Sequence, residues 1–180
     1  MFSRGVLAIL AGGALAVGLS GCFGAPAVKT STSAPAFASD KEAYAAAEKT
    51  YRAYVEATNA LDYNVPTSLQ PALDLTTGEA NAADRKAFSN YQADGVRKHG
   101  VMRTVLLQPT SITSDRRQVH LAACIDVSGV ELSYPDGRSA VDPDRVRVQR
   151  VAIELTSRDR PRNELLISSI RGRDTGPACE

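Results

Sequence analysis

The sequence is poor in the features on which nucleic-acid-binding proteins and metalloproteins depend. It contains 21 Lys and Arg residues against 20 Asp and Glu residues, and only two histidines, His99 and His120. Such a balance of charge argues against a nucleic-acid-binding protein, which would carry a basic excess. The histidines do not stand at the spacing of metal ligands, and Asp142-Pro143-Asp144 lacks the further alternating oxygens of a calcium loop. We therefore expect no metal site, no cofactor and no nucleic-acid partner.

Signature motifs of the common enzyme classes are also missing. The sequence contains no glycine-rich phosphate loop, no Gly-x-Ser-x-Gly nucleophile elbow and no His-Glu-x-x-His helix. The uncharged apolar run at residues 5–19 is short for a membrane span, which needs about 20 residues, and its length is typical of a signal peptide. No catalytic residue can be assigned from motifs.

The segment Leu19-Ser20-Gly21-Cys22 ends this apolar run, and it resembles the lipobox, the cleavage motif of bacterial lipoproteins. Small residues before the cysteine let a signal peptidase reach the backbone, and the Cys22 thiol can carry a thioether-linked diacylglycerol. The resemblance implies a signal peptide at residues 1–21 and fatty acids such as palmitate on Cys22. It also implies attachment to the extracytoplasmic face of the cell membrane. An uncleaved anchor and a secretory signal without lipid are the alternatives.

The sequence has three cysteines, and lipid on Cys22 would leave Cys124 and Cys179 as an even pair. In an oxidising compartment such a pair predicts one disulfide. The rival interpretation is a reactive or metal-binding pair of thiols, but the close Cys or His spacing of such sites is missing.

Residues 22–39 are rich in Ala, Pro, Ser and Thr and poor in large apolar residues, which predicts a flexible tether. Residues 40–180 then form a single domain. Its first helix is expected to start at Asp40, because Ser39 and Glu42 have the spacing of a capping box. Apolar residues recur along it at intervals of three and four, and Pro66 should end it by residue 64 or 65.

A second long helix is expected between Thr77, a plausible N-cap, and Gly95. Beyond residue 100 the period changes to two, which predicts strands. The expected strands are 101–107, 119–127, 146–155 and 165–170, with a turn at 134–137. The apolar phase slips by one residue between Val148 and Val151, which predicts a β-bulge at Gln149-Arg150. Helices followed by antiparallel strands predict an α+β fold, with the N-terminal helices packed on a curved sheet of about four strands.

This order of elements resembles the nuclear transport factor 2-like (NTF2-like), or ketosteroid-isomerase-like, cone over residues 39–179. Such cones occur in many actinobacterial lipoproteins of uncharacterised function. The motifs that carry the resemblance are Ala123-Cys124-Ile125-Asp126, the Pro135-Asp136-Gly137 turn and Gly176-Pro177-Ala178-Cys179. In that group a cystine often closes the last strand onto the earlier one, which matches the predicted pair. The sequence departs from the group in lacking the tryptophan common in the last strand.

The resemblance implies a pocket between helix and sheet, and Tyr51, Tyr54 and Asp126 are the residues that could line it. Tyrosines at helical spacing are more often core residues, and an aspartate beside a cystine is more often at the surface. The first hypothesis is a membrane-anchored, extracytoplasmic, non-catalytic lipoprotein that binds a small apolar ligand or an envelope protein. A purely structural role is not separable from it. The alternative is a pocket enzyme of the isomerase or dehydratase kind that uses Asp126 and a tyrosine.

Overall fold

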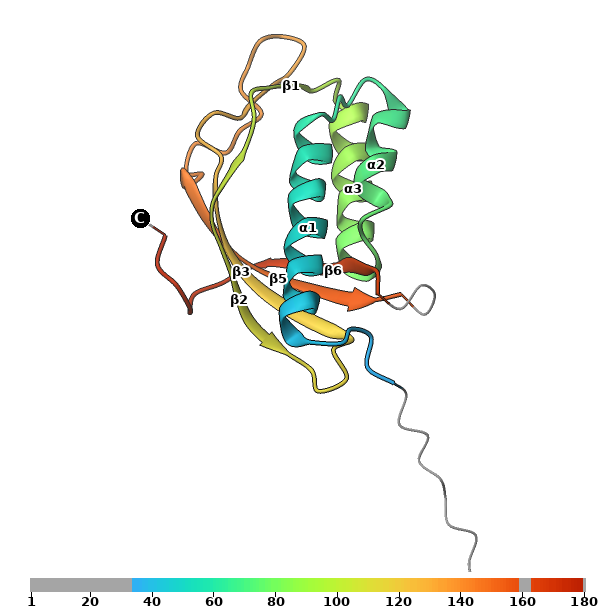
Figure 1. Cartoon of the computed structure of the whole chain (residues 1–180). Coiled ribbons are helices and arrows are strands. Elements are labelled where there is room, and N and C mark those ends of the chain that lie inside the picture. Colours follow the sequence, from blue (N-terminus) through green and yellow to red (C-terminus); the bar gives the residue numbers. More distant parts are fainter. Residues whose placement is uncertain (1–33, 159–162, 180) are drawn as a thin grey trace, which may run out of the picture. The chain divides into compact units, whose positions relative to one another are not determined.

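Three α-helices cover one face of a curved, open antiparallel sheet (Figure 1). The structure is a computed structural model, and it describes residues 34–158 and 163–179. The predicted signal peptide, Cys22 and residues 22–33 of the predicted tether lie outside the described residues. Within those two ranges, no helix combines the length and the apolar character that crossing a bilayer would require.

The helices are α1 (Asp40–Asn59), the 3₁₀ helix η1 (Pro66–Leu69), α2 (Gln70–Leu73) and α3 (Gly78–Ala93). The start of α1 is confirmed. The Ser39 hydroxyl accepts a hydrogen bond of 3.2 Å from the Glu42 N–H, and the Glu42 carboxylate accepts one of 3.1 Å from the Ala38 N–H. The helix ends at Asn59, earlier than predicted. The carboxylate of Asp62 accepts a hydrogen bond from the Asn64 N–H, and this turn replaces a further helical turn.

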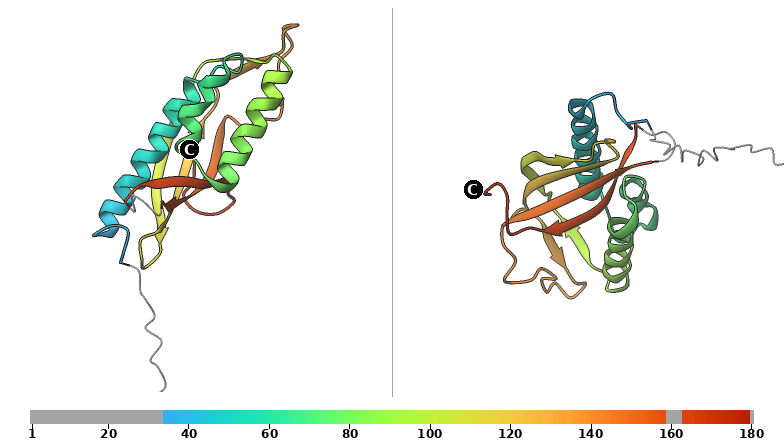
Figure 2. Two further views of the ribbon diagram at one scale, coloured as in Figure 1. Left: turned by 90° about the vertical axis from the view of Figure 1, so that its right-hand side faces the viewer. Right: turned by 90° about the horizontal axis from the view of Figure 1, so that it is seen from below.

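The strands are β1 (Arg97–His99), β2 (Arg103–Ile112), β3 (Gln118–Asp126), β4 (Glu131–Ser133), β5 (Val148–Ser157) and β6 (Leu165–Gly172). Four of them pair in the order β2-β3-β5-β6, and every pairing in this sheet is antiparallel. The short strands β1 and β4 form a separate two-stranded sheet. Figure 2 shows the four-stranded sheet curving around the helices that pack on its inner face. The predicted α+β class is therefore confirmed.

The main core lies between α1 and the inner face of the sheet. In β3 the side chains of Val119, Leu121, Ala123 and Ile125 alternate toward it, and in β5 those of Val151, Ile153 and Leu155 do so. On α1 the buried residues are Ala43, Ala47, Tyr51 and Val55, at helical spacing.

The predicted bulge at Gln149-Arg150 is wrong. Pairing between β3 and β5 runs without interruption, with Ile125 opposite Gln149 and Cys124 opposite Arg150. The apolar phase changes because the first valines stand apart from the core; Val146 is 64% exposed. The register shifts of the sheet lie instead in the pairing of β2 with β3 and of β5 with β6.

Part of the predicted tether packs on the domain. Ala36 and Phe37 are buried in the main core, with Phe37 only 9% exposed. The Ala36 N–H donates to the carbonyl of Asp115 at 3.0 Å, and Arg116 pairs with Asp40 at 2.6 Å. Arg116 has a φ of 54°, a left-handed conformation that costs energy for a residue with a side chain. The β2–β3 turn thus fixes the segment that leads into α1.

The predicted disulfide between Cys124 and Cys179 is confirmed, with the two Cα atoms 5.6 Å apart. Cys124 lies on β3 between Ala123 and Ile125, which face the core. Its side chain therefore leaves the opposite, outer face of the sheet, as strand alternation requires. The bridge holds the C-terminal tail against that outer face.

Candidate functional site

Five polar side chains meet inside the domain, between α1, α3 and the start of β2. We call them the polar cluster: Tyr51, Tyr54 and Thr58 of α1, Asp84 of α3 and Thr104 of β2. The three α1 residues share one helix face, because they are spaced at three and four. The Tyr54 hydroxyl donates a hydrogen bond of 2.9 Å to Oδ1 of Asp84. This contact joins the two long helices across the interior.

The polar cluster is short of hydrogen-bond partners. Among the described residues, five buried side-chain oxygen atoms have none, and four of these belong to the polar cluster. They are Tyr51 Oη, Thr58 Oγ1, Asp84 Oδ2 and Thr104 Oγ1. A buried polar atom without a partner costs about 1–3 kcal/mol. Native proteins contain few such atoms, so four of them in one interior region make this region a candidate site for the polar group of a ligand.

Burial changes the proton affinity of the cluster. It raises the pKa of Tyr51 to about 12, which the nearby Thr104 hydroxyl partly offsets. Burial, followed by the negative charge of Asp84, raises the pKa of Tyr54. Burial also raises the pKa of Asp84, against the opposing effect of the hydrogen bond from Tyr54. Both tyrosines therefore stay protonated at neutral pH, and Asp84 holds its proton more tightly than an exposed aspartate does.

Three aromatic rings, those of Tyr63, Phe88 and Tyr91, pack together, and we call them the aromatic wall. Tyr91 also lines a cavity at the rim of the domain. The ring of Tyr63 lies 5.8 Å from that of Phe88 and 4.8 Å from that of Tyr91. Burial raises the pKa of Tyr63 to about 12, and the charges of Tyr91 and Asp84 add to this effect. Tyr63 is thus within electrostatic reach of the polar cluster on one side and stacks on Tyr91 on the other.

The cavity beside Tyr91, which we call the rim pocket, has a volume of about 580 Å³. Its lining comes from α3, β4, β5 and the loop 140–146: Tyr91, Leu132, Ala140, Val141, Asp142, Asp144, Arg145, Val146 and Gln149. This volume is in the range of small-molecule sites. Apolar side chains mixed with a few charged groups would suit a ligand of mainly apolar character.

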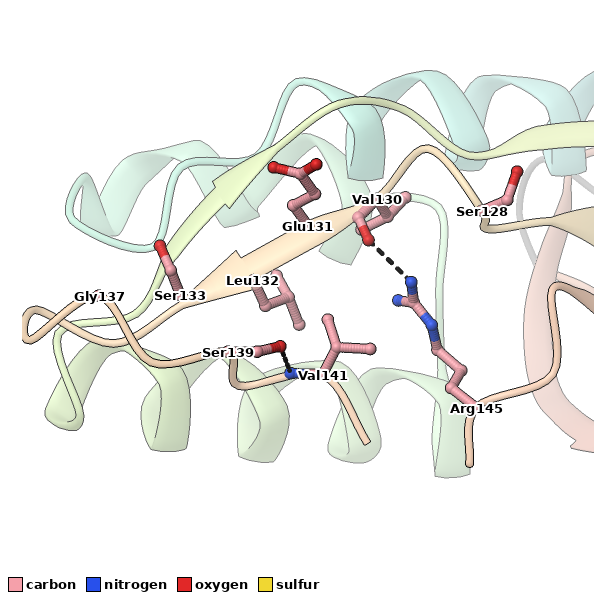
Figure 3. A pocket seen from close by; sticks show the side chains of 9 residues that line it. All are labelled: Ser128, Val130, Glu131, Leu132, Ser133, Gly137, Ser139, Val141 and Arg145. Carbon is pink, nitrogen blue, oxygen red and sulfur yellow. Dashed lines mark hydrogen bonds between the residues drawn. The ribbon is translucent and has the colours of Figure 1, made fainter. Parts of the chain in front are cut away.

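A second cavity, of about 380 Å³, lies on the other side of the loop 140–146 (Figure 3). The guanidinium of Arg145 donates to the carbonyls of Val127 at 3.1 Å and Val130 at 2.8 Å. Figure 3 also shows Leu132 and Val141 between β4 and the loop, and these two residues line both cavities. Arg145 therefore holds the loop that separates the two cavities and shapes the rim pocket.

The structure brings together two of the three residues predicted to line a pocket. Tyr51, which is 0% exposed, and Tyr54 belong to the polar cluster. Asp126 does not: it alternates with the inward-facing Ile125 and shares the outer face with Cys124. Ser128, by its side chain and its N–H, lowers the pKa of Asp126, and Arg147 and Arg103 add to this. Asp126 is an ionised surface carboxylate that anchors a turn.

The carboxylate of the site is Asp84, which the motif search missed. A signal for it was present, because Asp84 stands four residues after Ala80 and four before Phe88, and both of these are buried. An acidic residue in the middle of an apolar helical stripe indicates an interior carboxylate. The alanines and charged residues around Asp84 are typical of a solvent-exposed helix face, so the pattern does not single out this carboxylate.

The remaining candidates lie elsewhere. His99 is exposed on β1, and His120 lies on the outer face of β3, opposite Glu154. Asp142 accepts a hydrogen bond from the Asp144 N–H, which closes a turn in the loop. In the ranges that the structure describes, no group of three or more His, Cys, Asp or Glu side chains is arranged to hold a metal ion.

No family model matches the sequence, and no curated protein matches it. Among solved structures, the chain is similar to the intermembrane space region of chloroplast protein ARC6. The identity is 14% and the TM-score 0.51, and the match covers 70% of this chain and 92% of that one. It is also similar to a protein from Novosphingobium aromaticivorans assigned as an aromatic ring hydroxylase. There the identity is 15% and the TM-score 0.52, with 75% and 96% covered. These likenesses concern the fold alone, helices packed on a curved antiparallel sheet.

Proposed function

We propose that this chain is a lipid-anchored, extracytoplasmic binding protein whose domain takes up a small, largely apolar ligand with one polar group. The polar group meets the polar cluster, and the apolar part lies along the aromatic wall toward the rim pocket. The lipobox at Cys22 supports the location, and the cystine is consistent with an oxidising compartment. The role is binding and not catalysis.

One observation carries the proposal: four buried oxygen atoms of the polar cluster, on α1, α3 and β2, make no hydrogen bond of normal geometry. Asp84 Oδ2 can only accept a hydrogen bond while the carboxylate is ionised, whereas the hydroxyls of Tyr51, Thr58 and Thr104 can donate or accept. A hydroxyl group on the ligand would satisfy both kinds of atom at once. The rings of Tyr63, Phe88 and Tyr91 would favour an aromatic or alicyclic body.

The test compares two probes that differ in one hydroxyl group, 1-naphthol and naphthalene. The protein is the chain from residue 22 with Cys22→Ala, which carries no lipid. We expect saturable binding of one 1-naphthol per chain, about tenfold tighter than naphthalene, because the hydroxyl removes an unmet hydrogen bond. Tyr51→Phe and Asp84→Asn should bring the affinity for 1-naphthol down toward that for naphthalene.

Asp94→Asn, at the exposed C-terminal end of α3 and outside both the polar cluster and the rim pocket, is the matched control and should leave the preference for 1-naphthol intact. Equal affinity for the two probes would contradict a role of the polar cluster in recognition. Failure of both probes to bind saturably would contradict the small-ligand proposal. It would favour the second occupant that the sequence suggests, an envelope protein.

A second candidate function is proton-transfer catalysis of the isomerase or dehydratase kind. The half-buried carboxyl of Asp84, with a raised pKa, one free oxygen and a hydrogen bond from the Tyr54 hydroxyl, favours it. Asp84 takes the place of Asp126 in this alternative. Deuterium exchange into a cyclic enone such as cyclohexenone, followed by NMR, would separate the two functions. Catalysis requires exchange that Asp84→Asn abolishes, whereas a binding protein leaves the exchange at its rate in buffer.

A further inference from the structure

A guanidinium group stands directly beside the disulfide on the outer face of the sheet. Nη2 of Arg173 lies 3.6 Å from Sγ of Cys124 and 3.6 Å from Sγ of Cys179. The rest of the side chain is held in place by the backbone: Nε donates to the carbonyl of Val151 at 3.3 Å, and Nη1 donates to that of Thr175 at 2.8 Å. These two hydrogen bonds therefore fix the guanidinium of Arg173 next to the two sulfur atoms.

The two sulfur atoms differ in accessibility. Cys124 is 0% exposed, whereas Cys179 is partly exposed in the C-terminal tail. A hollow of about 360 Å³ opens at the bridge, lined by Val105, Leu106, Ala178 and the two cysteines. An attacking group can therefore approach the bridge on the side of Cys179. The buried Cys124 sulfur is the natural leaving group.

Positive charge near sulfur favours the thiolate over the thiol, and a leaving thiol of lower pKa departs faster in thiol–disulfide exchange. Arg173 supplies such a charge to both sulfurs. Arg150 stands opposite Cys124 in the pairing of β3 with β5, so its side chain leaves from the same face of the sheet.

We propose that the disulfide between Cys124 and Cys179 is an exchange site that a dithiol reductant, such as a dithiol oxidoreductase, opens and closes. Arg173 is its positioning residue. A thiolate of the dithiol attacks Cys179 Sγ, the sulfur–sulfur bond breaks, and its electron pair stays on Cys124 Sγ as a thiolate held by Arg173. The second thiol of the dithiol gives up its proton and displaces Cys179. Cys179 leaves as a thiol that carries this proton, the proton of the first thiol passes to solvent, and the dithiol becomes a disulfide, so the bridge gains two electrons and one proton.

Opening the bridge changes one surface of the domain. The tail after Arg173 loses its covalent link to β3, and the half-buried side chain of Leu106, beside the already exposed Val105, becomes more accessible. This inference concerns the outer face of the sheet. It does not depend on the ligand proposed for the inner face.

The test measures how fast dithiothreitol reduces the bridge at neutral pH, by trapping free thiols and recording the mass shift of the oxidised full-length mature protein. We expect Arg173→Gln to slow the reduction at least about threefold, and Arg173→Lys to restore much of the rate because the charge remains. Arg138→Gln, in an exposed turn where it pairs with Asp136, is the matched control and should react at the wild-type rate.

A purely structural role of Arg173 makes the opposite prediction, because loosening the tail would speed up the reduction of Arg173→Gln. An unchanged or faster rate therefore overturns the proposal. If the variant does not fold, the pH dependence of alkylation in the reduced wild-type protein decides. One thiol should titrate well below the usual value of about 8.5, and titration of both thiols at or above that value overturns the proposal.

Discussion

The hydroxyl of Tyr54 on α1 donates a hydrogen bond of 2.9 Å to the carboxylate of Asp84 on α3, 30 residues further along the chain. It is the polar tie between the two long helices, in a region where the neighbouring polar atoms have no partner. The second oxygen of the same carboxylate, Oδ2, is buried and makes no hydrogen bond. One side chain therefore holds both the link between the helices and the free acceptor on which the proposed binding rests.

Replacing Tyr54 with Phe removes this tie and leaves a half-buried carboxylate with neither oxygen bonded. We expect the free energy of unfolding to fall by about 1–3 kcal/mol, because an interior acceptor loses its donor. Urea unfolding followed by circular dichroism measures the change. Tyr44→Phe, on the same helix and outside the polar cluster, is the control and should cost much less. In Asp84→Asn the cost of Tyr54→Phe should shrink, since the charged acceptor is already gone.

Asp84 should give the protein a pH dependence of a specific sign. Its pKa in the folded state is raised above the ordinary value of 3.8, so the folded protein holds this proton more tightly than the unfolded chain. The resulting stabilisation is complete below that value and is lost as the pH rises through the folded-state pKa. Asp84→Asn abolishes the titration. The difference in Tm between this variant and wild type should therefore shift in favour of the variant from about pH 3.5 to 7.

The comparison must be made as a difference, because several surface aspartates contribute with the opposite sign. The pKa values of Asp62, Asp115, Asp126 and Asp136 are lowered, chiefly by hydrogen bonds to neighbouring residues. These groups are common to both proteins and cancel. A constant difference in Tm across the pH range would contradict a raised pKa for Asp84.

Phe37 should behave as a core residue and not as part of a tether. It is 9% exposed and packs in the main core, and the Arg116 guanidinium reaches its carbonyl at 3.5 Å. Phe37→Ala should lower the free energy of unfolding by about 3 kcal/mol, as truncation of a buried aromatic side chain does. Chemical denaturation provides the measurement. The control is Ala34→Ser in the same segment, at an exposed position, and it should have little effect.

Removal of the disulfide should destabilise the domain without altering membrane attachment. The bridge closes a loop between positions 55 residues apart, which corresponds to about 4 kcal/mol as an upper value for the loss of chain entropy. The double variant Cys124→Ala, Cys179→Ala avoids a free thiol, and its thermal unfolding should not respond to reductant. The wild-type Tm should fall on reduction. A wild-type Tm that ignores reductant would contradict the assigned role of the bridge.

Attachment to the membrane should depend on Cys22 alone. Cys22→Ala removes the thiol that carries the lipid, and we expect an unprocessed or released protein. Partition between detergent and aqueous phases, together with metabolic labelling by a fatty acid, measures this. If the variant still enters the detergent phase as a processed, labelled species, the lipobox interpretation is wrong.

Local signals in the sequence were sufficient for much of the fold. Ser39 and Glu42 mark the start of α1 because their hydrogen bonds are made within one turn. The apolar alternation of residues 119–127 identifies β3 because one face of that strand packs on helices. Cys124 and Cys179 were paired by elimination, and that needs no coordinates.

The predictions of the bulge and of the position of Asp126 are wrong for one reason. A sequence pattern shows which residues share one face of a strand, but not which other element packs against that face. The phase change at Val148 and Val151 fits a bulge as well as a strand whose first valines are solvated, and only the pairing with β3 decides between them. The sequence suggests Asp126 as a pocket residue beside Tyr51 and Tyr54 because it lies on a strand of the sheet that packs on the helices. Alternation puts it with Cys124 on the outer face.

The residues along the chain thus determine the class of fold and the pairing of the two cysteines, because these follow from local patterns and from a count of reactive groups. The lipid attachment is a prediction from the same sequence. Tertiary structure alone decides which carboxylate meets Tyr54. Asp84 reaches it only because α1 and α3 lie on the same face of the curved sheet, a packing that depends on side chains from the whole domain. The polar cluster, and with it the proposed binding function, exists only in the folded chain.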